Sequence, residues 1–108
     1  MEQKFSDYFK FKQKEVDHVY KSSERIASCL GIRVLHTSDE FSGKFLVITP
    51  RKTGKAHERN KLRRQVKSII FEEKLYELSG TYVIILYHQA QKLSFDQIKQ
   101  FLLKLSAQ

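Results

Sequence analysis

Hydrophobic and polar positions alternate along the chain with two different periods, which predict helices in three stretches and strands in three others. The clearest helical stretch is 57–73, where apolar residues return every three or four positions and form one stripe: Leu62, Val66, Ile69 and Ile70. A shorter stripe of the same kind predicts a helix over 14–21. The third helix is predicted in 93–105, where Ser94 as N-cap and Gln97 three residues later form the pattern of a capping box.

The strand-like stretches are 26–37, 44–49 and 81–88. The last is dense in β-branched and aromatic residues, which predicts a strand buried on both faces. Segment 38–43 has turn composition, so we expect the first two strands to form a hairpin, and Pro50 to end its second strand because proline has no N–H for a ladder. The predicted order is αββαβα, an α+β fold with helices packed on a single small sheet.

Positive charge is concentrated beside the central apolar stripe. The chain has a net charge of +8, and residues 51–67 hold eight Lys/Arg and one Glu, so they carry +7 of it. We expect Gly54 to adopt a positive φ in the turn that leads into this helix. A solvated helix face is the ordinary explanation of a charged stretch, but this one has almost no acidic residues for i,i+4 pairs, and its like charges repel. The patch therefore favours a polyanionic partner, with nucleic acid as the first candidate and an anionic membrane surface as the second.

Arginine is suited to phosphate because its planar group donates two parallel hydrogen bonds and stays charged at any relevant pH. Asn60, within the cluster, could hydrogen-bond to a base edge or a 2′-hydroxyl. Near the N-terminus, Phe5, Tyr8 and Phe9 alternate with lysines, which fits either stacking on unpaired bases or packing of an N-terminal arm; we favour packing.

No self-sufficient active site is visible, so we expect no catalytic residue and no metal site in the protein. The four histidines lack the spacing of metal ligands. We interpret Cys29 as a small apolar filler of a strand, with a nucleophilic Cys/His site as the alternative. One cysteine forms no intrachain disulfide, which favours a reducing cytoplasm. No secretory signal is visible, the apolar run 82–87 is too short to cross a bilayer, and the length fits one domain over 1–108.

The stretch "GKAHERNKLRRQVKSIIF" resembles the protein subunit of bacterial ribonuclease P. That family has a strand, a basic turn with Lys and Gly, and a helix with Arg-Asn-Arg, one variable residue and Lys/Arg-Arg, which residues 59–64 match. Residues 11–21 and 82–105 are similar to its N-terminal helix and to its last strand and helix, so the resemblance covers nearly the whole chain. The sequence departs from the family where Lys61 replaces an arginine, Pro50-Arg51-Lys52 replaces Ser-Lys-Lys, and Val16 replaces an aromatic residue.

The resemblance implies a fold with an uncommon left-handed βαβ crossover, like that of the second domain of ribosomal protein S5. It also implies a holoenzyme in which a catalytic RNA, with bound Mg²⁺, removes the 5′ leader from precursor transfer RNA. The protein would be a subunit of this endoribonuclease, would bind the leader and would lower the magnesium requirement. Its partners would be ribonuclease P RNA and precursor tRNA, with neither a membrane nor DNA expected.

Two groups of residues are implied as binding sites. The first, which would dock on ribonuclease P RNA, comprises Arg51, Lys52, Lys55, Arg59, Asn60, Lys61, Arg63, Arg64 and Lys67. The second would line a groove between the N-terminal helix and the sheet and hold the single-stranded leader; it comprises Lys12, Val16, Tyr20 and Arg33.

Two other functions stay open at this point. One is a non-enzymatic ribosomal or assembly protein that binds structured RNA with a similar α+β fold. The other is a DNA-binding regulator that places the helix 57–73 in a major groove, although a strand and a turn precede this helix instead of the second helix of a helix-turn-helix motif.

Overall fold

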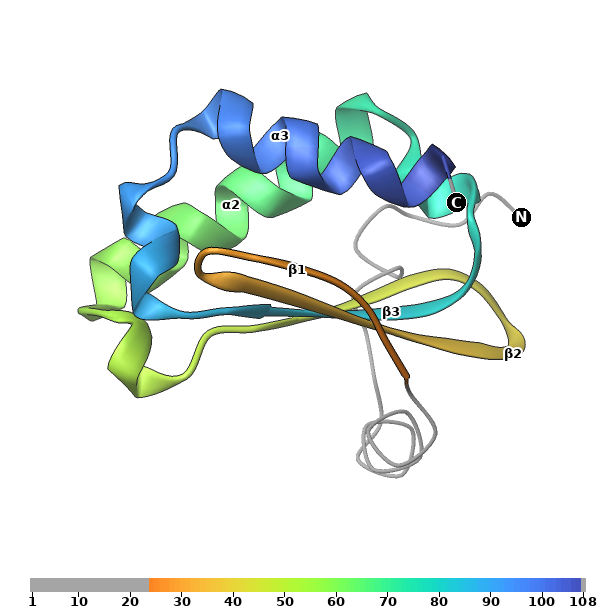
Figure 1. The fold of residues 1–108 in the computed structure, drawn as a ribbon, viewed down its shortest axis with the longest axis horizontal. Helices are drawn as coiled ribbons and strands as arrows, with labels where there is room; N and C mark the ends of the chain where they lie inside the picture. The colour runs from red at the N-terminus through yellow and green to blue at the C-terminus, as the bar shows by residue number, and fades with distance from the viewer. Residues whose placement is uncertain (1–23, 108) are drawn as a thin grey trace.

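The structure, a computed structural model, describes residues 24–107, which form a layer of helices over one face of a sheet (Figure 1). The strands are β1 (Glu24–Cys29), β2 (Ile32–Ile48) and β3 (Ser79–Leu86), and the α-helices are α2 (Ala56–Glu72) and α3 (Phe95–Leu103). Short 3-10 helices join or end them: η2 (Arg51–Thr53), η3 (Leu75–Glu77), η4 (His88–Lys92) and η5 (Lys104–Ala107). The predicted helix over 14–21 lies outside the described residues. The α+β class and the helices in 57–73 and 93–105 are confirmed.

The predicted strand over 26–37 is wrong, because the chain turns back within it. β1 pairs antiparallel with β2 from Cys29 opposite Ile32 onward, so the two strands form a tight hairpin. Gly31, in the turn, has φ +85°, a conformation that glycine adopts at little cost. Its carbonyl accepts a 2.8 Å hydrogen bond from the backbone N–H of Tyr87, which anchors the hairpin.

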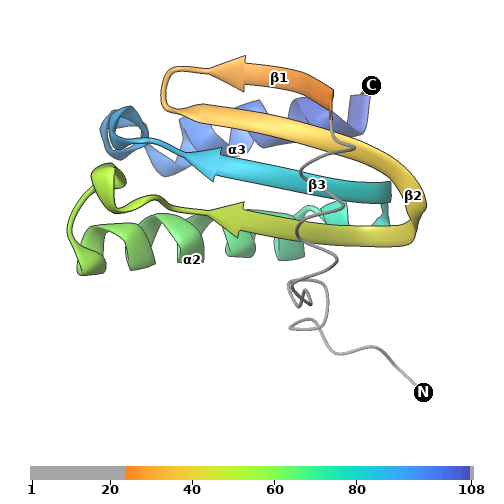
Figure 2. The ribbon, with the colours of Figure 1, turned by 90° about the horizontal axis from the view of Figure 1, so that it is seen from below.

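The predicted hairpin between 26–37 and 44–49 is also wrong, because β2 runs on through 38–43 and flanks β3 on both sides (Figure 2). In its first half, the pairs run antiparallel from Ile32 opposite Leu86 to Thr37 opposite Thr81. In its second half, partner numbers rise together, from Lys44 opposite Thr81 to Ile48 opposite Ile85, so this half runs parallel to β3. β3 is therefore central.

The strand predicted over 81–88 spans Ser79–Leu86, and the prediction is wrong for its last two residues, since Tyr87 is half-buried and His88 is exposed. The buried character of the remainder explains this arrangement. Every described side chain from Thr81 to Leu86 is buried, and so is Gly80. A strand that is apolar on both faces is most stable in the middle of a sheet. The two halves of β2 supply both of its neighbours.

The connection from the second half of β2 through α2 to β3 is a left-handed crossover, as the resemblance implies. In Figure 2, seen from the sheet side, both strands point left, β3 lies above the end of β2, and α2 runs behind the sheet. Viewed from the helix side with the strands pointing up, the chain moves to the left, opposite to the usual hand.

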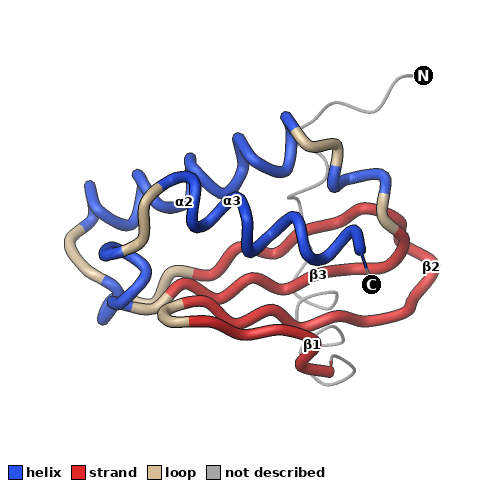
Figure 3. The backbone as a smooth tube through the Cα atoms, turned by 45° about the horizontal axis from the view of Figure 1, so that its top comes forward, coloured by secondary structure: helices blue, strands red, loops and turns tan. Residues whose placement is uncertain are grey.

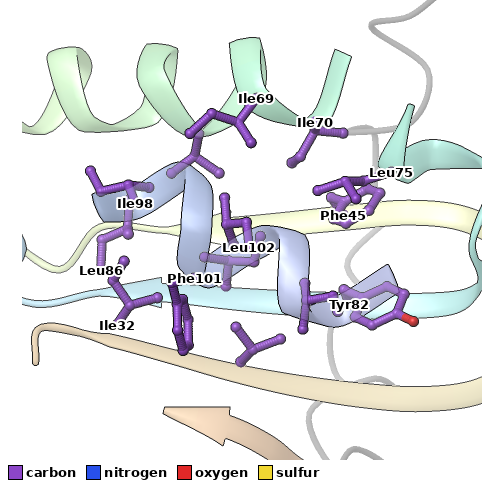
Figure 4. Close-up of a cluster of buried hydrophobic side chains, with 14 of the residues drawn as sticks. Ile32, Phe45, Ile69, Ile70, Leu75, Tyr82, Leu86, Ile98, Phe101 and Leu102 are labelled. Carbon is purple, nitrogen blue, oxygen red and sulfur yellow. The ribbon is translucent and has the colours of Figure 1, made fainter. Parts of the chain in front are cut away.

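The core lies between the sheet and the two helices (Figure 3). The predicted stripe of α2 is confirmed, since Leu62, Val66, Ile69 and Ile70 are all buried. In Figure 4 the side chains of Ile98, Phe101 and Leu102 from α3 extend toward those of the strands and α2. α2 is thus held by one face, and its other faces are available for function.

The start of α3 is also as predicted. The backbone N–H of Gln97 donates to the Ser94 hydroxyl at 3.1 Å, and the Ser94 N–H donates to Oε1 of Gln97 at 2.8 Å. This reciprocal capping box satisfies two N–H groups that the helix itself leaves without partners.

Candidate nucleic-acid interface

The turn before α2 is fixed by polar contacts with the segment after β3. The buried hydroxyl of Thr53 donates to the carbonyl of Leu86 at 2.5 Å. The Thr53 carbonyl accepts a hydrogen bond from the side-chain amide of Gln91, and Nδ1 of His88 lies 3.3 Å from it. These contacts hold the short helix η2, on which Arg51 and Lys52 are exposed.

Gly54 follows in this turn with φ +156° and ψ −168°, so the predicted positive φ is confirmed. That region of backbone conformation is essentially restricted to glycine. A Cβ at this position would lie 2.3 Å from Nε2 of Gln91 and 3.0 Å from Oε1 of Glu58. The glycine therefore lets the basic turn lie directly against the Gln91 side chain of η4 and beside Glu58 of α2.

The single acidic residue of the basic segment is used at the start of the helix. Oε1 of Glu58 accepts a hydrogen bond from the backbone N–H of Lys55 at 2.9 Å. A carboxylate in the first turn also interacts favourably with the helix dipole. Glu58 thus stabilises the N-terminus of α2. Segment 51–67 has no other acidic residue to neutralise the cations of the following turns, so they can interact with an anionic ligand.

The cations of α2 lie beside and opposite its core stripe. Arg59 and Arg63 are half-buried along the flank, whereas Lys61 and Arg64 are exposed. A shallow hollow of about 410 Å³ lies on this surface, and its lining is His57, Asn60, Arg63, Arg64 and Lys67. The structure therefore brings together four of the predicted RNA-binding residues around one concave surface.

Arg63 has a fixed orientation within this hollow. Its Nη1 donates to the hydroxyl of Thr49 at 3.1 Å, and its Nη2 donates to Oδ1 of Asn60. The amide oxygen of Asn60 accepts this bond, so its NH₂ group is the part of the side chain that could donate to an acceptor on a ligand. Thr49, which orients Arg63 here, carries no local sequence signal that predicts this contact.

Arg33, the described member of the predicted leader group, lies on the opposite side of the sheet from α2. Its guanidinium carbon is 5.8 Å from the centre of the Tyr87 ring, within the range of a cation–π contact. The apolar side chains around Tyr87 on this face form a second cluster: Val83, Ile85, Leu35, Leu46 and Ile48. Lys12, Val16 and Tyr20 lie outside the described residues.

Cys29 is exposed at the end of β1, so its interpretation as an apolar filler is wrong. Partial burial of the sulfur raises the pKa of its thiol above the ordinary value, which disfavours the reactive thiolate.

Glu73, near the end of α2, forms an ion pair with Lys99 at 3.1 Å. Its hydrogen bond and charge raise the pKa of Lys99. These contacts give Glu73 a structural role.

Within residues 24–107, no group of three or more His, Cys, Asp or Glu side chains is arranged to hold a metal ion. Over the same residues, no helix has the length and apolar character needed to span a membrane.

Comparisons with known proteins agree with this geometry. A family model described as ribonuclease P matches residues 10–108. The chain is 33% identical over 104 residues to the ribonuclease P protein component of Onion yellows phytoplasma (strain OY-M), covering 90% of this chain and 70% of that protein.

Two solved structures share the fold. The RNase P protein of Staphylococcus aureus superposes with a TM-score of 0.78 at 21% identity, covering 92% of this chain and 94% of that one. The RNase P protein of Thermotoga maritima gives 0.74 at 22% identity, with 86% and 89% covered. The chain therefore belongs to the ribonuclease P protein family, the RNA-binding components of an endoribonuclease holoenzyme that processes transfer RNA.

Proposed function

We propose that the basic surface of η2 and α2 binds ribonuclease P RNA. The residues that would make the contacts are Arg51, Lys52, Lys55, Arg59, Asn60, Lys61, Arg63, Arg64 and Lys67. The observation that carries the proposal is the hollow in which Arg63, tied to Thr49 and Asn60, faces outward beside Arg64 and Lys67. Guanidinium groups held in this way lose little conformational entropy when they bind phosphate.

Arg59 adds a second argument. Its Nε is buried and has no hydrogen-bond partner within the described residues. A buried N–H without an acceptor costs free energy, roughly 1 to 3 kcal/mol. If a small rotation of the half-buried side chain exposed this N–H, a phosphate oxygen could accept its hydrogen bond, so an anionic ligand would offset that cost.

We further propose that the sheet face bearing Arg33 and Tyr87 binds the 5′ leader of precursor tRNA, together with Lys12, Val16 and Tyr20. A cation beside an aromatic and apolar surface suits a single strand, whose phosphates and unstacked bases are both accessible. The two RNA partners would then meet opposite faces of the sheet, which keeps their binding sites separate.

The protein would assist the chemistry through charge. The catalytic RNA and the substrate are polyanions that repel each other. Cations fixed on the protein would neutralise part of this charge, so less free magnesium would be needed to screen the repulsion. When bound, Mg²⁺, held mainly by the RNA, would supply the activation of water and the stabilisation of the leaving oxygen. The protein's own residues would bind and orient the substrate, without a catalytic group. We propose the cytoplasm as its location and RNA, in preference to DNA, as its ligand.

Reconstitution tests this function. The full chain, mixed with ribonuclease P RNA and precursor tRNA at a magnesium concentration too low for the RNA alone, should restore leader removal. Arg59→Ala/Arg63→Ala should abolish the stimulation, whereas Arg25→Ala/Lys104→Ala, which removes two exposed cations from other elements, should not. Tight, salt-sensitive RNA binding without stimulation would instead favour a non-enzymatic RNA-binding protein, and equal affinity for duplex DNA would contradict the preference for RNA.

The leader site needs its own comparison. In the reconstituted holoenzyme, Arg33→Ala should weaken binding of precursor tRNA with a leader and leave mature tRNA unchanged. An equal loss for both RNAs would contradict leader binding at this face.

A further inference from the structure

α2 carries a second line of residues on the side opposite its core stripe. His57, Asn60, Arg64, Lys67 and Phe71 follow one another at spacings of three and four, so they share one face of the helix. Two hollows follow this line and share Arg64 and Lys67. The first is the hollow of about 410 Å³ described above, and the second, of about 420 Å³, is lined by Arg64, Lys67, Ser68 and Phe71.

Phe71 is the unusual member of this line. Its side chain is 56% exposed, and among the described residues only Leu30, at 61%, is a large hydrophobic side chain of comparable exposure. Its neighbour Ile70 is fully buried, so Phe71 does not continue the core stripe. An aromatic ring therefore lies at the surface, at the end of a row of cations.

We propose that Phe71 stacks on an unpaired nucleobase of the RNA whose phosphates are bound by Arg64 and Lys67. Every base offers a π-face, so aromatic side chains beside cations bind single-stranded nucleotides with little dependence on sequence. Lys67 precedes Phe71 by about one helical turn, roughly 6 Å along the axis. A phosphate at Lys67 and a base at Phe71 are thus within reach of the same short RNA segment. This inference rests on the proposed binding of ribonuclease P RNA to α2.

Affinity measurements with three variants test the stacking. The full chain is titrated with ribonuclease P RNA at several salt concentrations. Phe71→Ala should weaken binding about 5- to 150-fold, the range measured for loss of one base–aromatic stack. Phe71→Tyr, which keeps the ring, should stay within about twofold of the original protein. Leu30→Ala, which removes the other exposed large hydrophobic side chain, should have no effect.

The salt dependence separates stacking from charge. Phe71→Ala should leave the slope of log affinity against log salt unchanged because no phosphate contact is lost. Arg64→Ala should make this negative slope less steep because one phosphate contact is lost. Chemical probing of the bound RNA should show an unpaired base that the original protein and Phe71→Tyr protect and Phe71→Ala exposes.

The outcomes distinguish this inference from the proposed function. If the original protein binds the RNA and Arg64→Ala weakens binding, but Phe71→Ala does not, the stacking is overturned and the basic surface stands. If neither Arg64→Ala nor Phe71→Ala changes the affinity, both proposals fail. A dimer in sedimentation that Phe71→Ala dissociates, with RNA affinity unchanged, would show that Phe71 contacts a second copy of the chain and would also overturn the inference.

Discussion

The guanidinium of Arg63 donates a hydrogen bond to the hydroxyl of Thr49, 3.1 Å away, across 14 positions of sequence. Thr49 directly follows β2, whereas Arg63 lies in the middle of α2. The orientation of a side chain on the proposed RNA surface is therefore set by the end of a strand.

Thr49→Val tests this relationship. The substitution keeps the shape of the side chain and removes the hydroxyl, so Arg63 loses its hydrogen bond to residue 49 and keeps the one to Asn60. We expect affinity for ribonuclease P RNA to fall about three- to tenfold, the equivalent of one ordinary hydrogen bond. The dissociation constant, measured by filter binding, gives the result.

A double-mutant cycle provides the control for Thr49. In an Arg63→Ala background, Thr49→Val should have no further effect on RNA affinity, because the contact it removes is already absent. Equal losses in both backgrounds would mean that Thr49 acts on RNA binding without Arg63.

The cations that line the hollow on α2 should set the salt dependence of binding. Arg64→Ala/Lys67→Ala should lower the slope of log affinity against log salt by about 1.5, since each phosphate contact contributes about 0.7 to 0.9. Arg25→Ala/Lys104→Ala removes the same net charge from β1 and η5 and should leave the slope almost unchanged. Identical slopes for the two double variants would show that net charge, and not the surface of α2, governs binding.

Gly31 should be intolerant of any side chain. Its φ of +85° disfavours other residues, and a Cβ would lie 2.2 Å from the backbone nitrogen of Ala90. Gly31→Ala and Gly31→Asn should therefore both lower the free energy of unfolding, by about 2 to 3 kcal/mol, as measured by urea denaturation. Asparagine tolerates a positive φ, so a Gly31→Asn protein as stable as the original would show that the close approach to Ala90 is unimportant. Ser28→Ala, at an exposed strand position, should change stability by no more than about 0.5 kcal/mol.

The Cys29 thiol should react slowly despite its exposure. Partial burial raises its pKa, so at neutral pH a smaller fraction is thiolate than in the unfolded chain. Alkylation by iodoacetamide at pH 8 should be slower in native protein than in urea, and the native rate should continue to rise to higher pH. Faster alkylation of the native protein would revive the alternative of a nucleophilic cysteine.

Periodicity predicted α2 and α3 because each presents one regular stripe to one core. Leu62 and Val66 are buried where the spacing places them, and the Ser94 cap forms as its sequence pattern indicates. The family resemblance predicted the crossover hand, which the spacing of apolar residues does not encode. The helix stripes and the Ser94 cap could therefore be predicted from local patterns, and the crossover hand from the resemblance to a family.

The strand pairing was not accessible, because alternation indicates which residues form strands and leaves their neighbours undetermined. Gly31 was the available signal for the first turn, but the alternation after it also fits a longer strand. Turn-like composition in 38–43 suggested a hairpin, whereas β3, more than 30 residues later, pairs with both halves of β2. In the candidate site, the hydroxyl of Thr49 and the ring of Tyr87 gain their roles only when distant segments meet.

The central place of β3 has a consequence for synthesis of the chain. Ile32 pairs with Leu86 and Lys44 with Thr81, so neither half of β2 gains its β3 partner until the ribosome has passed residue 86. The basic helix is complete earlier, but its apolar stripe packs in a core that also contains β3 and α3, which follow it in the chain. Contacts so distant in sequence slow folding. During synthesis, most of the positive charge of this protein therefore leaves the ribosome before the fold that orients it can form.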